Sequence, residues 1–120
     1  MFKESLQGIV DGTDGGLAGL LMDFEGIPLE VYTRHEAPFD MEAVGAEVSV
    51  VVKSIQRATE MLEAGETTEV AFKSDKLTTV IRVINGTYFM AVTLQPDGNL
   101  GKARYLMRVC APKLKKELEA

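Results

Sequence analysis

Few side chains in this sequence could carry out catalysis. His35 is the only histidine, and it lies between Arg34 and Glu36 in a polar stretch. Nucleophilic catalysis needs a serine, cysteine or threonine beside an oriented base, and a shared metal site needs a second ligand of the right type. We therefore interpret His35 as an exposed bystander and expect no enzyme. The 18 acidic residues leave a carboxylate pair open, because sequence alone cannot bring two of them into one cleft.

Two glycine-rich stretches could cradle a cation or a phosphate. Residues 11–16 read DGTDGG, but they lack the acidic alternation and the terminal glutamate of a calcium loop. Residues 98–102 read GNLGK, yet Pro96 stands where a phosphate loop needs its first glycine, and Ala103 stands where it needs a serine or threonine. We expect neither a metal ion nor another cofactor.

Composition indicates one compact domain over residues 1–120. Hydrophobic residues make up 46% of the chain, charged residues 26%, and the net charge is −5. Nucleic acid requires an electropositive surface, so it is a poor partner for this chain. No apolar stretch approaches the roughly 20 residues of a membrane span, and the first residues do not resemble a signal peptide. We expect a cytoplasmic protein with no membrane insertion.

The charge is distributed unevenly along the chain. Acidic residues dominate the first two-thirds, whereas basic residues gather near the C-terminal end. We interpret this basic group as the solvated face of a helix. Its members are Lys102, Arg104, Arg108, Lys113, Lys115 and Lys116.

Hydrophobic spacing predicts the order helix, strand, strand, long helix, three strands, helix. The expected ranges are 2–10, 17–24, 27–33, 40–64, 68–74, 77–84, 87–94 and a closing helix from 100. The first strand is apolar nearly throughout and should lie centrally, whereas Pro28 should place the second strand at an edge. Asp40 is the expected N-cap of the long helix and Gly65 its C-terminal stop. This order predicts an α+β sandwich, one antiparallel sheet with helices on its faces.

Residues 68–74 and the long helix both offer surface for a partner. Residues 68–74 alternate polar with apolar, which predicts that Val70 and Phe72 point into the core. The long helix carries one apolar seam at 3-4 spacing and a second, shorter row through Gly45, Val52 and Thr59. Two rows exceed what packing on one sheet requires. Either row could face the sheet.

Three parts of the sequence resemble the Roadblock family in their order and spacing. These are LAGLLMDFEGIPLEVYT at residues 17–33, the long helix with its following meander, and NLGKAR at residues 99–104. The likeness covers nearly the whole chain and is greatest to bacterial members of the MglB and MglC type. It implies a five-stranded antiparallel sheet with the long helix on one face and the terminal helices on the other.

The resemblance also implies a homodimer, in which the third strand pairs with its mate and the long helices lie side by side. Together with the spare apolar surface, it predicts a set of dimer-interface residues. The set is Val48, Val52, Ile55, Thr59, Glu69, Val70, Ala71 and Lys73.

By the same resemblance, the chain regulates or scaffolds a Ras-like small GTPase of the MglA type in bacterial polarity or motility. It would bind the GTPase, another Roadblock protein, or both. Such proteins reshape the GTPase switch regions, so no residue needs a catalytic role. The compact chain lacks long extensions, which favours an adaptor over an activator. The expected contact residues on the long helix are Glu42, Glu47, Lys53, Gln56, Arg57 and Glu60.

Two other functions remain open. A small sensory module could hold a ligand against the same kind of sheet, although the inward strand residues read as filled core. A purely structural scaffold subunit needs the same dimer and the same exposed helix, so sequence does not separate it from the regulator.

Overall fold

The computed structural model describes residues 2–34 and 37–120, so the interpretation of His35 lies outside the described residues. The helices and strands follow the predicted order, which confirms the α+β class. Their bounds are α1 (Phe2–Asp11), β1 (Gly16–Asp23), β2 (Pro28–Thr33), α2 (Met41–Met61), β3 (Glu69–Lys73), β4 (Thr78–Val83), β5 (Tyr88–Leu94) and α3 (Leu100–Leu118).

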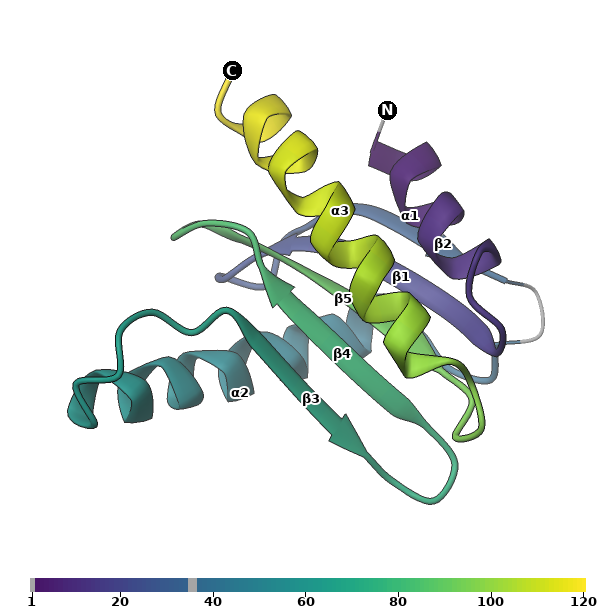
Figure 1. The fold of residues 1–120 in the computed structure, drawn as a ribbon, viewed down its shortest axis with the longest axis horizontal. Coiled ribbons are helices and arrows are strands. Elements are labelled where there is room, and N and C mark those ends of the chain that lie inside the picture. Colours follow the sequence, from purple (N-terminus) through teal and green to yellow (C-terminus); the bar gives the residue numbers. More distant parts are fainter. Residues whose placement is uncertain (1, 35–36) are drawn as a thin grey trace.

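The strands form one antiparallel sheet of five strands in the order β2-β1-β5-β4-β3. β1 is internal and β2 lies at an edge, as predicted from the apolar run and from Pro28. The register between β1 and β2 shifts between Leu21 and Met22. Figure 1 shows α1 and α3 on one face of the sheet and α2 on the other.

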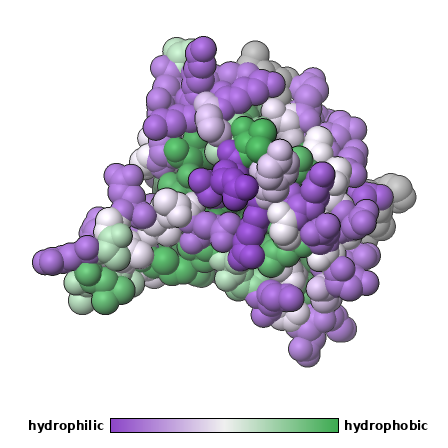
Figure 2. All heavy atoms as spheres, in the orientation of Figure 1, coloured by the Kyte–Doolittle hydropathy of each residue, from purple (hydrophilic) through white to green (hydrophobic). Residues whose placement is uncertain are grey.

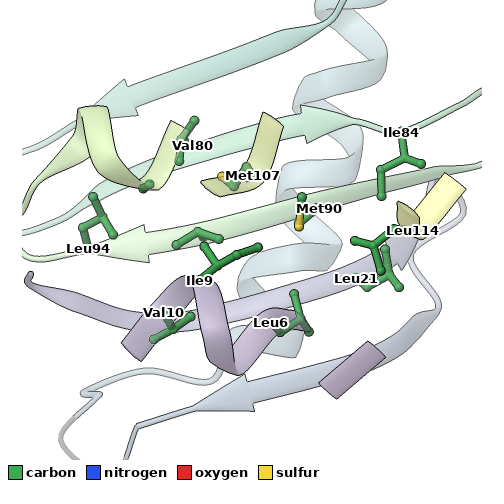
Figure 3. Packing of buried hydrophobic residues seen from close by; sticks show 12 residues of the cluster. Leu6, Ile9, Val10, Leu21, Val80, Ile84, Met90, Leu94, Met107 and Leu114 are labelled. Carbon is green, nitrogen blue, oxygen red and sulfur yellow. The ribbon is translucent and has the colours of Figure 1, made fainter. Parts of the chain in front are cut away.

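A hydrophobic cluster fills each face of the sheet. Successive residues of β1 alternate between the clusters, with Leu21 toward α1 and α3 and Leu20 toward α2. Figure 3 shows the first cluster, in which Leu6 of α1 and Met107 of α3 lie over the strands. Because β1 is covered on both sides, the helices on the two faces are needed to exclude water from the same strand.

α2 begins where the sequence predicts and ends earlier. The Asp40 side chain accepts a hydrogen bond from the Glu42 amide at 3.0 Å, which confirms the N-cap. The predicted stop at Gly65 is wrong, because Glu63 already adopts a left-handed φ of 53°. The Ala64 amide then reaches back to the Thr59 carbonyl oxygen at 2.9 Å. These backbone bonds form a Schellman-type end before the glycine is reached.

Gly45 sets the distance between α2 and β1. A Cβ at this position would lie 2.8 Å from Cε of Met22 and also too close to Cδ2 of Leu20. Both of these side chains are fully buried, so they have little room to move away. The absence of a side chain at Gly45 therefore brings the helix onto the sheet.

We expect Gly45→Ala to lower the free energy of unfolding by about 1 to 2 kcal/mol, because overpacking outweighs the gain in helix propensity. Gly8→Ala is the matched control, since its Cβ would meet nothing within 4 Å on α1. That control should raise the free energy of unfolding by about 0.5 to 1 kcal/mol. Urea denaturation of both variants measures the difference, and equal effects would contradict the close packing at Gly45.

Candidate protein interface

The outer side of β3 is a free sheet edge. Among the described residues β3 pairs only with β4. The Val83 amide donates to the Thr68 carbonyl oxygen at 3.0 Å. Antiparallel partners alternate between hydrogen-bonded and non-hydrogen-bonded pairs, so even-numbered residues of this strand direct their backbone groups at β4. The backbone groups of Glu69, Ala71 and Lys73 therefore point outward.

Side chains of β3 alternate between the two faces of the sheet. Val70 pairs with Ile81, which belongs to the cluster under α2, so Val70 and Phe72 share that face. The predicted alternation is confirmed, but the prediction that Phe72 lies in the core is wrong. Phe72 is 44% exposed, because α2 packs mainly against β1 and β2 and leaves this part of β3 open.

The predicted interface residues of α2 point in different directions. Val48 and Val52 are 4% and 0% exposed beneath the sheet, so placing them at a dimer interface is wrong. They have no surface left to bury against a second chain. Ile55 and Thr59 are half-buried, and Oγ1 of Thr59 lies 2.9 Å from Oγ1 of Thr67. The row through Val52 therefore faces the sheet, together with the first members of the seam, Met41 and Val48.

Sequence reasoning missed an exposed apolar stripe on α2. Val51 is 47% exposed and Leu62 is 75% exposed. Ile55 and Ala58 lie between them at 4-3-4 spacing, which keeps all four on one side of the helix. We call these four residues the α2 stripe. Figure 2 shows hydrophobic side chains along the lower edge of the molecule, over α2.

The signal for this stripe was present in the seam at 3-4 spacing. The seam contains Met41 and Val48, which are buried, together with Val51 and Leu62, which are exposed. Spacing identifies the apolar side of a helix, but it does not show where the helix extends beyond the sheet. In Figure 1 the C-terminal end of α2 projects past the strands, and this projection exposes the later members of the seam.

The residues predicted to bind a partner are spread around α2. Glu42, Lys53 and Glu60 are exposed. Lys53 lies about three turns after Glu42, and Glu60 lies about two turns after Lys53, so all three are on one side of the helix. Glu47 is exposed on the opposite side, near the α2 stripe. The remaining two residues of the predicted set are Gln56, which is half-buried, and Arg57, which is exposed.

A polar cleft of about 590 Å³ lies beside this helix. Its lining comes from the C-terminal half of α2, the following loop, the turn between β4 and β5, and the end of α3. Gln56 and Glu60 line one side, and Lys115 lines the other.

Within the described ranges 2–34 and 37–120, no three His, Cys, Asp or Glu side chains come together as metal ligands. The same part of the chain holds no helix long and apolar enough to cross a bilayer.

Solved structures resemble this chain over nearly its whole length. MglC from Myxococcus xanthus is 35% identical, and the match covers 95% of this chain and 96% of MglC with a TM-score of 0.68. The chain belongs to the Roadblock family. A Roadblock/LC7 domain from Streptomyces avermitilis superposes more closely, with a TM-score of 0.88 over 98% of both chains at 14% identity. Membership therefore rests on the identity to MglC, and the Roadblock fold rests on the closer superposition.

A third structure, described as MglB with tetrameric arrangement, has a TM-score of 0.84 at 16% identity. That match covers 94% of this chain and 84% of that MglB chain. No protein-family model matches this Roadblock chain, and no curated protein does. The five-stranded sheet, with α2 alone on one face, confirms the bacterial MglB/MglC-like Roadblock fold that the sequence predicts.

The exposure of Phe72 changes the expected result of a charged substitution. Phe72→Asp should cost about 1 to 2 kcal/mol of unfolding free energy, because only part of the ring is removed from water. Ile81→Asp is the matched control on the same face, where a fully buried charge should prevent folding. Circular dichroism with urea denaturation at low protein concentration separates the two. Unfolding of both variants would contradict the open position of Phe72.

Proposed function

We propose that this Roadblock protein is a homodimeric, non-catalytic regulator or adaptor for a Ras-like small GTPase of the MglA type. Its setting would be bacterial cell polarity or motility, and it would bind the GTPase or the Roadblock protein that activates it. The observation that carries the proposal is the free edge of β3, together with the exposed α2 stripe. Membership of the family supports the same role.

The residues of β3 favour antiparallel pairing with a second copy about a two-fold axis at Ala71. This register pairs every outward backbone group of Glu69, Ala71 and Lys73 with an outward group of the mate. Glu69 then lies opposite the partner's Lys73, so both cross-strand pairs at the ends are oppositely charged. On the other face, Phe72 lies opposite the partner's Val70. This one pairing therefore covers the exposed Phe72 ring and also gives hydrogen-bond partners to the outward backbone groups of β3.

The α2 stripe is the second part of the proposed interface. A two-fold axis through β3 brings the two α2 helices to the same face of a continuous sheet. Val51 and Leu62 would then be covered by the mate, which accounts for apolar side chains that one protomer leaves in water. Of the residues predicted at the interface, Ile55, Thr59 and the β3 set stay in this proposal, whereas Val48 and Val52 leave it.

The GTPase or the second Roadblock protein would bind on the polar side of α2. Glu42, Lys53 and Glu60 present both signs of charge there, which suits electrostatic selection of a partner. Gln56 and Arg57 extend this surface around the helix, whereas Glu47 lies on the opposite side, near the α2 stripe. A protein that acts by holding the switch regions needs position and charge at this surface, and it needs no nucleophile or general base.

Ala71→Pro should abolish self-association while leaving the protomer folded. The lost amide hydrogen points away from β4, so the β3 and β4 pairing keeps its hydrogen bonds. Val70→Pro is the matched control, because it removes an amide that faces β4 and should destabilise the protomer itself. Sedimentation velocity reports association, and urea denaturation reports folding. A dimer that survives Ala71→Pro would exclude pairing through β3.

A charge exchange tests the register at Ala71. Lys73→Glu alone should weaken dimerisation roughly tenfold, because two like-charged pairs replace two attractive ones. Glu69→Lys combined with Lys73→Glu should restore part of the affinity, although it also breaks the ion pair between Glu69 and Arg104 within each protomer. Equal weakening by the single and double variants would show that Glu69 does not face the partner's Lys73.

Affinity capture from native cytosol tests the partner class. The wild-type protein and a Lys53→Glu and Glu60→Lys variant serve as baits, with GDP or a nonhydrolysable GTP analogue added and captured proteins read by mass spectrometry. A small GTPase or a second Roadblock protein should be recovered by the wild type and lost with the variant. Lys3→Glu, on exposed α1, is the control that should retain the partner. Recovery of neither class would overturn the regulatory role, and nucleotide-independent capture would favour a structural scaffold.

A further inference from the structure

The face of the protein opposite α2 carries a concentrated positive charge. Within residues 100–116 the chain has six basic residues and no acidic one. With Glu117 included, α3 carries a formal charge of +5, although the whole chain carries −5. The alternation of β3 adds Lys73 to the same face of the sheet. The solvated-face interpretation accounts for exposed lysines, but it does not account for the apolar groups among them.

Two apolar side chains protrude from the middle of this charge. Tyr105 is 50% exposed and Val109 is 58% exposed, one helical turn apart. Nζ of Lys102 lies 6.0 Å from the centre of the Tyr105 ring, and Cζ of Arg108 lies 5.8 Å from it. The ring is therefore held between two cations and keeps half of its surface open. We call Lys102, Tyr105, Arg108 and Val109 the α3 patch.

A carboxylate already binds beside this patch. Nε of Arg104 lies 3.1 Å from Oε2 of Glu69 on β3. The pair is partly exposed, with 41% and 30% of the two side chains accessible, so its contribution to stability is small. Its geometry shows that a guanidinium on this side of α3 can meet a carboxylate that approaches over the sheet. Among the residues that the structure describes, Arg108, one turn further along, forms no ion pair with a carboxylate.

We propose that the α3 patch binds an acidic segment of a partner protein, with an apolar side chain of that segment resting on Tyr105 and Val109. Carboxylates suit the guanidinium of Arg108, which can take them in a two-pronged arrangement. An anionic bilayer fits less well, because the rest of the chain is strongly acidic and only two apolar side chains protrude. This site is on the face opposite α2, so it is separate from the proposed GTPase surface. It borders the proposed dimer interface at Glu69 and Lys73, but no residue of the α3 patch belongs to that interface.

Fluorescence anisotropy tests the binding directly. The probe is a short labelled peptide in which glutamates flank two leucines, and its control has glutamine at every glutamate. The full chain should bind the acidic peptide in a salt-sensitive way and the glutamine peptide far more weakly. Vesicles of equimolar phosphatidylserine and phosphatidylcholine should not bind the protein, which cosedimentation measures.

Variants then locate the site. Arg108→Glu should weaken peptide binding about tenfold, and Tyr105→Ala roughly threefold. Lys113→Glu makes the same charge change on exposed α3 outside the patch and should weaken binding less than about twofold. Circular dichroism should show all three folded, since none of these side chains is buried. Equal losses for Arg108→Glu and Lys113→Glu would mean a general charge effect and would overturn the site, as would preferential vesicle binding or no peptide binding.

Discussion

The structure depends on the burial of β1 on both faces. A strand that is apolar nearly throughout cannot lie on the surface of a sheet, so it requires hydrophobic cover from two directions. α1 and α3 cover one face, and α2 covers the other at a distance that Gly45 makes short. Once β1 and β5 are central, β2 and β3 become the edges, and the position of α2 decides which edge stays open.

The position of α2 also separates two surfaces of opposite character. The helix covers the β1 and β2 side and leaves Phe72 and the α2 stripe in water. The other face carries the basic residues of α3 around an exposed tyrosine. A protein with distinct surfaces on the two faces of one sheet can contact two partners without competition between them. This division requires no catalytic residue.

Sequence patterns predicted the elements, the central and edge strands, and the alternation within β3, because each depends on local spacing and on residues such as Pro28. They did not predict the end of α2, since a left-handed glutamate at Glu63 is uncommon and the nearby Gly65 is the usual signal. They also assigned Val48 and Phe72 wrongly. Whether an apolar residue is covered depends on where α2 crosses the sheet, and that crossing depends on contacts far apart in the chain.

The two edges of the sheet differ as templates for further strands. Pro28 gives the β2 edge a position without an amide hydrogen, and the register shift between Leu21 and Met22 bends the pairing there. A filament built by edge-to-edge addition needs two competent ends on every chain. This fold offers one regular edge, so growth through strand edges would stop after the single addition that the proposed dimer makes. The irregular β2 strand, at the opposite side of the sheet from β3, would then act against open-ended polymerisation.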